Sequence, residues 1–342
     1  MEAYSETGQM VLDTAHRICE DAAAGQEEDR AVRAWRALED AGLTRALDGG
    51  GDEEAGGIGL ADGLLLAGAP GRHGLPSTLA DTLIAGWLAG LAGLACPPGA
   101  LGLVPVPLTL AGDGVSGVAR VPGGRAAAAF VAVADRDDEP HVVVFPAENA
   151  AITEQDNVAG DPVDRVEFSG WIATDAMRTL PGAHDRLRLA GAVSRSLLMA
   201  NALSAVLDLT LSYAPGRTQF GQPLPKFQAI QHGLARMASH CAASQVAALH
   251  AARAFGQNRD NAWQAVAAAK ARVGEAVGLV TGLAHQIHGA TGFTSDYPLH
   301  RLTRRAWAWR DEFGSESRWS RELGEHACRA GAGRLWATVT EM

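Results

Sequence analysis

The sequence lacks most of the features that mark metal, redox and membrane proteins. Its 342 residues include four cysteines, and no two of them form a Cys-x-x-Cys pair, which argues against a zinc site or a disulfide framework. The net charge of −10 favours neither a nucleic-acid partner nor an anionic membrane surface. Glycine and proline interrupt the apolar stretch from 60 to 95, so we expect no membrane span. The N-terminal residues carry acids at helical spacing instead of a signal-peptide pattern. We therefore expect a cytoplasmic protein.

Common catalytic signatures are missing too. The chain has no Gly-x-Ser-x-Gly, Walker or His-Glu-x-x-His element. The motifs of hydrolases, nucleotidases and zinc peptidases therefore do not indicate its function. What is present is a hydrophobic content of 47% in a chain long enough for two or three domains. The 29 lysines and arginines leave room for a local basic pocket that binds a phosphate-bearing ligand.

The pattern of apolar residues changes twice along the chain. Residues 1–98 space them three and four apart, as helices do. Residues 99–178 carry short apolar stretches bounded by turns, which is typical of strands. Residues 179–342 return to helical spacing, clearest between Phe227 and Phe255. The sequence therefore predicts a mostly helical α+β protein with an N-terminal helical domain, a small middle β domain and a C-terminal helical bundle.

The bundle is predicted to contain three long helices and two short ones. The long helices are expected at about 183–212, from near 225 to 255, and 261–288, and the short ones at 299–310 and 316–336. The first is apolar nearly all round, so we expect it to be buried on several sides.

One loop between predicted bundle helices carries a basic side chain. Arg217 lies on a Gly-containing turn shortly before the helix that begins near Pro225, and Gln228 follows in its first turn. An arginine beside a helix N-terminus combines charge, donors and dipole in a way that suits a diphosphate. The alternative is a loop arginine that is only solvated.

A second loop carries small residues where a ligand can approach the backbone. Gly289 and Ala290 follow the polar side chain of Gln286, and the absence of bulk permits close contact. His285 and His288 are three residues apart, but no third ligand lies at a spacing useful for a metal.

Taken together, these loops resemble the acyl-CoA dehydrogenase family. The resemblance rests on Arg217-Thr-Gln219-Phe220-Gly221, on Phe227-Gln228-Ala-Ile-Gln-His232, on Gln286-Ile-His-Gly289-Ala290-Thr-Gly292-Phe293 and on Tyr297-Pro298. It implies a helical domain, a middle β-barrel domain and a four-helix bundle. It also implies the cofactor FAD, an acyl-CoA substrate, an electron-transferring flavoprotein as partner, and a homo- or hetero-oligomer of such chains.

The resemblance assigns roles to residues of this chain. In the family, FAD lies at a subunit interface, and the residues at the matching positions hold its ADP portion for the neighbouring subunit. The corresponding positions here are Arg217, Gln219, Phe220, Gln228, Gln286, Gly289 and Ala290. The family's reaction removes an α-proton from the acyl-CoA with a carboxylate base, while a hydride passes from the β-carbon to the flavin.

The position of the catalytic base departs from the family pattern. The common base is a glutamate sixteen residues after the tyrosine of the Tyr-Pro pair, and counting from Tyr297 reaches Phe313. Glu312 is one residue early, and one helical residue is about 100° of rotation, so we expect it to point elsewhere. Some members carry the base on the first bundle helix, where this chain has Asp185. Asp185 is therefore the candidate base. The alternatives are that Asp185 is only a first-turn aspartate stabilised by the helix dipole, and that a partner chain supplies the base.

The middle domain also departs from the family. The Thr-Glu-Pro and Gly-Ser-Asp motif and the Trp-x-Ser/Thr that contact the flavin in the family are missing from residues 105–125 and from the strands around them. The chain has thus lost the usual base, the strand motif and the Trp-x-Ser/Thr. In this it resembles the shorter subunit of heterotetrameric acyl-CoA dehydrogenases that act on steroid side chains or other bulky thioesters. Three functions remain open: an acyl-CoA dehydrogenase or a subunit of one, a non-catalytic subunit that completes a partner's FAD site, and a homodimer that carries out other flavin chemistry on a thioester.

Overall fold

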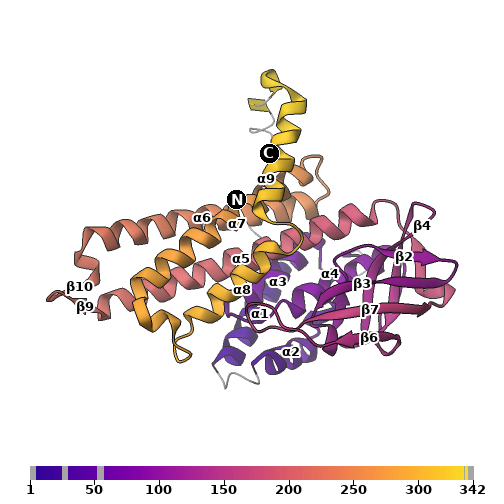
Figure 1. Cartoon of the computed structure of the whole chain (residues 1–342), viewed down its shortest axis with the longest axis horizontal. Helices are drawn as coiled ribbons and strands as arrows, with labels where there is room; N and C mark the ends of the chain where they lie inside the picture. The colour runs from indigo at the N-terminus through magenta and orange to yellow at the C-terminus, as the bar shows by residue number, and fades with distance from the viewer. Residues whose placement is uncertain (1–4, 25–29, 52–57, 335, 338–342) are drawn as a thin grey trace.

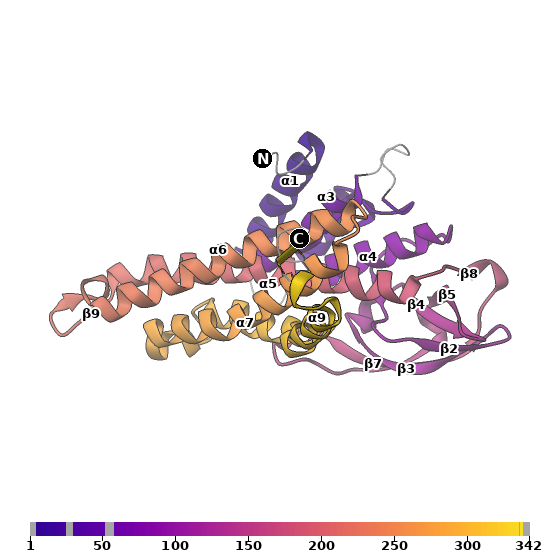
Figure 2. The same ribbon diagram turned by 90° about the horizontal axis from the view of Figure 1, so that it is seen from above.

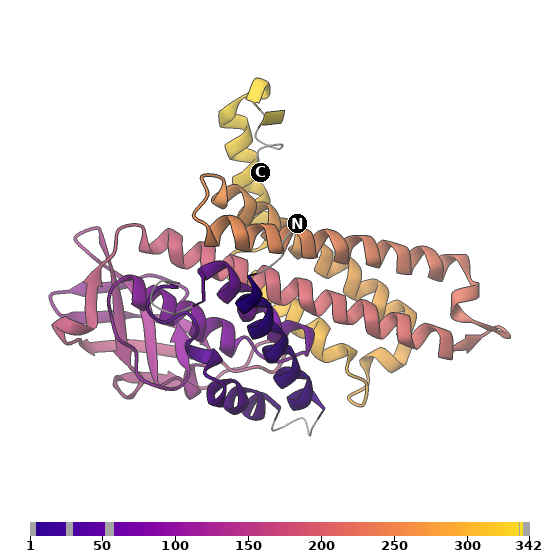
Figure 3. The same cartoon turned by 180° about the vertical axis from the view of Figure 1, so that it is seen from behind.

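The computed structural model describes residues 5–24, 30–51, 58–334, 336 and 337. Helices come first, then a sheet, then helices again (Figure 1). The first group comprises α1 (Glu6–Ala23), α2 (Arg30–Asp40), α3 (Leu60–Arg72) and α4 (Thr78–Leu91). Among these, α3 and α4 are apolar and largely buried, whereas α1 and α2 are amphipathic and bury one face. Helix α1 packs against both α2 and α3, and Figure 3 shows this group of helices from behind.

Eight strands between Leu101 and Thr179 form one sheet. They are β1 (Leu101–Leu103), β2 (Leu108–Ala111), β3 (Gly114–Pro122), β4 (Ala129–Arg136), β5 (Glu139–Pro146), β6 (Ala150–Thr153), β7 (Val163–Trp171) and β8 (Met177–Thr179). The spatial order is β6-β7-β3-β2-β4-β5-β8, and β1 also pairs with β4. Strands β1 and β2 run parallel to β4, and the other pairs are antiparallel.

Strand β4 joins the two cores of the molecule. Its six residues from Ala129 to Ala134 are all buried, and successive side chains of a strand point to opposite faces. Val131 and Val133 pack in the core shared with the helices. Phe130 packs in a second core on the other face of the sheet, edge to face against Phe168. A continuous apolar run of small and β-branched residues suits a strand buried on both sides.

The C-terminal helices pack around one long central helix. They are α5 (Ala183–Gly216), α6 (Gln228–Gly256), α7 (Ala262–His288), α8 (Leu299–Asp311) and α9 (Glu316–Ala330). Helix α5 contacts α3, α6, α7 and α8, so it is buried on several sides, as its apolar composition predicted. By length and composition α5 is also the one described helix that passes a test for a membrane span, and half of the window that passes is buried inside the protein.

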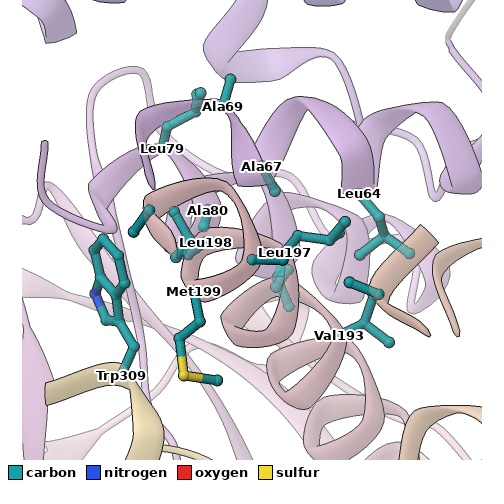
Figure 4. Close-up of a cluster of buried hydrophobic side chains, with 14 of the residues drawn as sticks. Leu64, Ala67, Ala69, Leu79, Ala80, Val193, Leu197, Leu198, Met199 and Trp309 are labelled. Carbon is teal, nitrogen blue, oxygen red and sulfur yellow. The ribbon is translucent and has the colours of Figure 1, made fainter. Parts of the chain in front are cut away.

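Glycines let α3 and α5 approach closely. A Cβ added at Gly71 would lie 2.2 Å from the backbone oxygen of Leu198, and one at Gly68 would lie 2.7 Å from Cβ of Leu197. The surrounding apolar side chains interlock across this contact, with Leu64 and Val193 at one end and Trp309 of α8 at the other (Figure 4). The close contact fixes the N-terminal helices on the bundle.

Two predicted helix ends differ from the structure. Helix α5 continues to Gly216, four residues beyond the predicted end at Ser212. Helix α9 ends at Ala330, short of the predicted end at Trp336, because Gly331 adopts a positive φ of 81°. A positive φ is open to glycine at little cost, and the helix does not continue through it.

Candidate functional site

Two neighbouring cavities lie where the sheet meets the helices. We name the first the α5 cavity: it has a volume of about 920 Å³ and is lined by the first turns of α5, the segment before β2, the β6–β7 connection and the turn between α8 and α9. We name the second the α2 cavity: it has a volume of about 550 Å³ and lies between α2, the β3–β4 connection and the end of α8. Both volumes fall within the range of small-molecule sites.

The two cavities share part of their walls. Pro122, Asn157, Val163 and Glu312 line both of them. The α2 cavity is mainly apolar, with the side chains of Trp35 and Trp309 in its wall, among others. The α5 cavity has more charged residues in its wall, which are Arg120, Asp135, Asp156, His184, Asp185, Arg188, Asp311, Glu312 and Arg318. The two cavities therefore differ mainly in the number of charged side chains in their walls.

Glu312 lies at the shared wall and is held by a buried arginine. Arg195 Nε donates to Glu312 Oε2 at 2.5 Å, and Arg195 Nη2 donates to Asp81 Oδ1 at 2.7 Å. The side chains of Arg195 and Asp81 are 0% and 1% exposed, whereas that of Glu312 is 22% exposed. Burial would lower the pKa of Arg195, but its two carboxylate partners outweigh that effect and raise it. The arginine therefore stays charged and ties α4 and α5 to the end of α8.

This arrangement corrects the expectation that Glu312 points away from the site. The rotation argument assumed that Glu312 continues a helix, but α8 ends at Asp311 and Glu312 has extended backbone angles. Phe313 follows with a positive φ of 54°. The reversal of the chain at these two residues lets both side chains line the α5 cavity.

A buried lysine of α7 holds the turn between α8 and α9 in place. Lys270 Nζ donates to the carbonyl oxygens of Arg310 at 2.6 Å and Gly314 at 2.7 Å. Burial lowers the pKa of Lys270 to about 7, although the nearby Glu312 carboxylate opposes the shift. The ring of Phe313 covers Gly191, where an added Cβ would lie 2.3 Å from it. The turn is therefore anchored from both sides.

Asp185, the predicted base, lines the α5 cavity. It is exposed in the first turn of α5, where a carboxylate is stabilised by the helix dipole. Its neighbour His184 lines the same cavity, and His184 Nε2 lies 2.6 Å from Asp135 Oδ1 at the end of β4. Asp185 remains a predicted base.

The predicted ADP-binding residues lie at the opposite end of α5. Arg217, Gln219, Phe220 and Gln228 are exposed around the short hairpin of β9 (Thr218–Gln219) and β10 (Gln222–Pro223). Phe220 is 92% exposed, with a positive φ of 50°. When the amide oxygen and nitrogen of Gln219 are exchanged so that both have suitable partners, the oxygen accepts a hydrogen bond from Arg217 Nη2 at 2.8 Å. The hairpin thus presents a cation, an amide and a flat aromatic ring to the outside.

The second predicted loop lies beside the first. Tyr213, near the end of α5, donates to the carbonyl oxygen of His288 at 3.2 Å, and the two rings stack with centroids 4.3 Å apart. Gln286, Gly289 and Ala290 are exposed at this end of the bundle, and Gly289 has a φ of 59°. The fold therefore brings the seven predicted residues to one end of the bundle, with a donor set that fits a diphosphate and its attached sugar.

The histidines near this loop already have hydrogen-bond partners. His288 Nε2 lies 3.1 Å from the Tyr297 hydroxyl, and His285 Nε2 lies 3.0 Å from Thr303 Oγ1. Within the described part of the chain, no group of three or more His, Cys, Asp or Glu residues is placed to hold a metal ion.

The two ends of α5 are too far apart for one ligand bound to a single chain. Helix α5 has 34 residues, and at ~1.5 Å per residue it is about 50 Å long. Figures 1 and 2 show the hairpin of β9 and β10 at one end of the molecule and the sheet at the other. A ligand held by both kinds of site must therefore lie between two chains.

Comparison with known proteins agrees with this architecture. Residues 189–318 match the family described as acyl-CoA dehydrogenase, C-terminal domain. The solved structure of a variant of the steroid ACAD Tcur3481–Tcur3483 superposes with a TM-score of 0.82 at 24% identity, over 96% of this chain and 99% of that one. The match covers the bundle, which supports the predicted resemblance, and the structural likeness confirms the predicted fold class.

Two further relatives show how far the likeness extends. The ChsE4–ChsE5 complex from Mycobacterium tuberculosis superposes with a TM-score of 0.80 at 22% identity, over 96% of this chain and 98% of that one. The 3-sulfinopropanoyl-CoA desulfinase of Paraburkholderia xenovorans is 34% identical over 157 residues, which are 44% of this chain and 40% of that protein. The chain thus aligns with less than half the length of this curated relative.

Sequence reasoning missed the buried charges around the site. Arg195 and Asp81 lie in apolar helices, and Lys270 lies within an alanine-rich stretch of α7. A charged residue inside an otherwise apolar helix face is a usable signal, because such groups are rarely fully buried without a partner. Their partners come from other elements, so the pairing itself needed the fold.

Proposed function

We propose that this chain is a subunit of an FAD-dependent acyl-CoA dehydrogenase that shares its cofactor with a second chain of the same family. One observation carries the proposal: seven outward-facing residues that suit the ADP portion of FAD lie about 50 Å along α5 from the cavities that suit an acyl thioester. The homologous bundle and the shared fold support it. FAD would supply the hydride acceptor.

The residues of this chain have separate roles in the proposal. Arg217 and Gln228 bind the diphosphate, while Gln286 and Gly289 border it from the second loop. Phe220 covers the adenosine portion, and Gln219 orients Arg217 through their hydrogen bond. The wall of the α5 cavity lacks the flavin-binding strand motif of the family, which favours a partner chain as the holder of the reactive ring.

The proposal also covers the partners and the location of this chain. The partner is a second acyl-CoA dehydrogenase-like chain, since the ChsE4–ChsE5 structure has the same fold and is a complex. An electron-transferring flavoprotein would reoxidise the flavin, and the cytoplasm is the proposed location. The second candidate is a non-catalytic subunit that only completes the partner's FAD site, which the apolar Phe313 at the usual base position favours.

Co-expression tests the proposal. The chain is produced alone and together with a full-length acyl-CoA dehydrogenase homologue from the same genome, and FAD is measured by absorbance after gel filtration. We expect FAD in the mixed complex, and bleaching of the flavin by an acyl-CoA. Arg217→Ala should lower FAD affinity ~10- to 100-fold, as loss of a charge-assisted hydrogen bond implies.

The control is Arg321→Ala, because Arg321 is a surface arginine whose side chain is 68% exposed on α9. A complex that binds FAD equally well with Arg217→Ala and Arg321→Ala would contradict the proposed cofactor site. A mixed complex that retains full turnover with Phe313 and Asp185 both replaced would favour the non-catalytic role.

A further inference from the structure

Tyr213 connects the two loops of the proposed cofactor site. It lies in the last turn of α5, shortly before Arg217 of the first loop. Its hydroxyl donates to the carbonyl oxygen of His288, the last residue of α7, at 3.2 Å. The same hydroxyl lies 3.4 Å from that of Thr291, in the middle of the second loop (Gly289–Phe293). One side chain beside the first loop therefore contacts both the start and the middle of the second.

The contact ties the end of α7 to the end of α5. A helix leaves the carbonyl oxygens of its last turn without partners inside the helix. At the end of α7 the Gly289 N–H donates to the carbonyl oxygen of His285, and the Tyr213 hydroxyl donates to that of His288. Gly289 then turns the chain with a positive φ of 59°. The point at which the second loop leaves its helix is thus fixed by a residue of another helix.

The ring of Tyr213 is held by the rings around it. It stacks on the ring of His288 with centroids 4.3 Å apart, and it packs edge to face against Tyr297 at 5.8 Å. His288 Nδ1 lies 2.8 Å from the carbonyl oxygen of Ala284, so Nδ1 carries a proton. Burial lowers the pKa of His288, which keeps the ring neutral, and Nε2 accepts from the Tyr297 hydroxyl at 3.1 Å. The three rings form one packed cluster.

We propose that Tyr213 is a positioning residue for the cofactor site: its hydroxyl sets the spacing between the Arg217 hairpin and the second loop, so that both contact the ADP portion of one FAD. The inference rests on the proposed function and deepens it, because it names the residue that joins two separate loops into one site. Without this hydroxyl the second loop loses its attachment to α5, and FAD has to order the loop when it binds, at a cost in affinity.

The expected effect is selective for one part of the cofactor. FMN has the flavin ring of FAD but ends at its first phosphate, so it lacks the adenosine that the two loops would bind. In the proposed function the partner chain holds the ring. A change in loop spacing should therefore weaken the binding of FAD and leave that of FMN unchanged, whereas a general loss of folding would weaken both.

Cofactor titration of the mixed complex tests the inference. The complex of this chain with its full-length acyl-CoA dehydrogenase-like partner is freed of flavin, and FAD or FMN is titrated in while flavin fluorescence is recorded. We expect Tyr213→Phe to raise the Kd for FAD ~3- to 10-fold, as loss of a neutral hydrogen bond implies, and to leave the Kd for FMN unchanged. The phenylalanine keeps the ring that stacks on His288.

Ser196→Ala is the matched control. Ser196 is a buried residue of α5 whose hydroxyl also donates to a backbone carbonyl oxygen, that of Ala192, at 2.8 Å. At ~1.5 Å per residue it lies about 25 Å along the helix from Tyr213, so its loss should change neither Kd. Hydrogen exchange gives a second measurement on the flavin-free protein: the amides of the second loop should exchange faster in Tyr213→Phe than in Ser196→Ala.

The outcomes separate this inference from the proposed function. If the unmodified complex binds no FAD, the proposed cofactor site fails. If it binds FAD, and Tyr213→Phe binds FAD equally tightly or loses affinity for FAD and FMN by the same factor, Tyr213 does not position the loops. If Tyr213→Phe does not assemble with the partner chain, exchange decides: second-loop amides as slow as in Ser196→Ala would overturn the inference.

Discussion

Arg195 is the residue on which the arrangement of the site depends most. It binds Asp81 of α4 and Glu312 at the end of α8 from the middle of α5, so one guanidinium connects three elements. A buried ion pair contributes little net stability compared with an apolar replacement of both partners, but removal of one partner leaves an uncompensated buried charge. The effect of a single substitution at Arg195 should therefore be large.

We predict that Arg195→Met lowers the free energy of unfolding by ~3–5 kcal/mol, because it leaves Asp81 charged and almost fully buried. The measurement is urea denaturation followed by circular dichroism. The matched control is Arg321→Met, whose side chain is 68% exposed and which should change stability by less than ~0.5 kcal/mol. Equal and small effects of the two substitutions would show that the buried pair is not formed in solution.

At the scale of elements, the contact between α3 and α5 determines how the N-terminal helices are placed against the bundle. The contact depends on glycine, because the backbone of α5 lies where a side chain of α3 would otherwise be. Backbone atoms cannot move aside as a flexible side chain can, so the strain of an added methyl group must be taken up by separation of the helices.

Gly71→Ala should therefore destabilise the protein by ~1–3 kcal/mol, since the new Cβ would lie 2.2 Å from the backbone oxygen of Leu198. Gly282→Ala is the matched control on α7: nothing lies within 4 Å of the added Cβ, and alanine is the better helix former by up to ~1 kcal/mol. Thermal unfolding of the two variants should shift in opposite directions. A shift in the same direction would contradict the close contact.

A histidine pair attaches α1 to the end of α3. His16 Nδ1 lies 3.1 Å from His73 Nε2, a contact that requires at least one neutral ring. Burial, with the charges of His16 and Arg72, lowers the pKa of His73 to about 4. Burial and Arg72 also lower the pKa of His16, against the opposing charges of Asp13 and Glu20. The folded state therefore disfavours protonation of both rings.

We predict that acidification weakens the attachment of α1. In the unfolded chain both histidines bind protons near their ordinary pKa of 6.5, so the unfolded state gains protons first as the pH falls. Stability is retained above pH ~6.5 and decreases toward pH ~4, by ~1–3 kcal/mol in total. His73→Phe should flatten this dependence in hydrogen-exchange measurements of α1. An unchanged slope in that variant would exclude the pair as its source.

At the scale of the whole molecule, the proposed function requires a second chain to complete the cofactor site. One end of α5 offers residues for the ADP portion, the other end offers the cavities, and about 50 Å of helix separates them. Assembly, cofactor binding and stability should therefore be linked by mass action.

We predict that added FAD raises the melting temperature of the mixed complex with its partner chain but not that of this chain in monomeric form. At 100-fold excess over the dissociation constant the gain in stability is ~2.7 kcal/mol. Differential scanning fluorimetry across a series of FAD concentrations measures it. A monomer of this chain that is stabilised as strongly as the complex would show that one chain suffices for the site.

The sequence by itself determined the order and type of the elements, because apolar periodicity and turn residues are local properties. It also marked the two loops around Arg217 and Gln286, where short motifs carry the family resemblance. Helix ends were less well predicted, since Gly331 ends α9 through its backbone conformation.

Only the tertiary structure decided what surrounds the cavities. The chain reversal at Glu312 and Phe313 depends on Arg195 and Lys270, which are distant in the sequence and reach the turn from α5 and α7. Counting residues from Tyr297 could find the position of Phe313 but could not find the direction of the Glu312 side chain. That direction is set by buried charges that must find partners on other elements, and such pairing is a property of the folded chain.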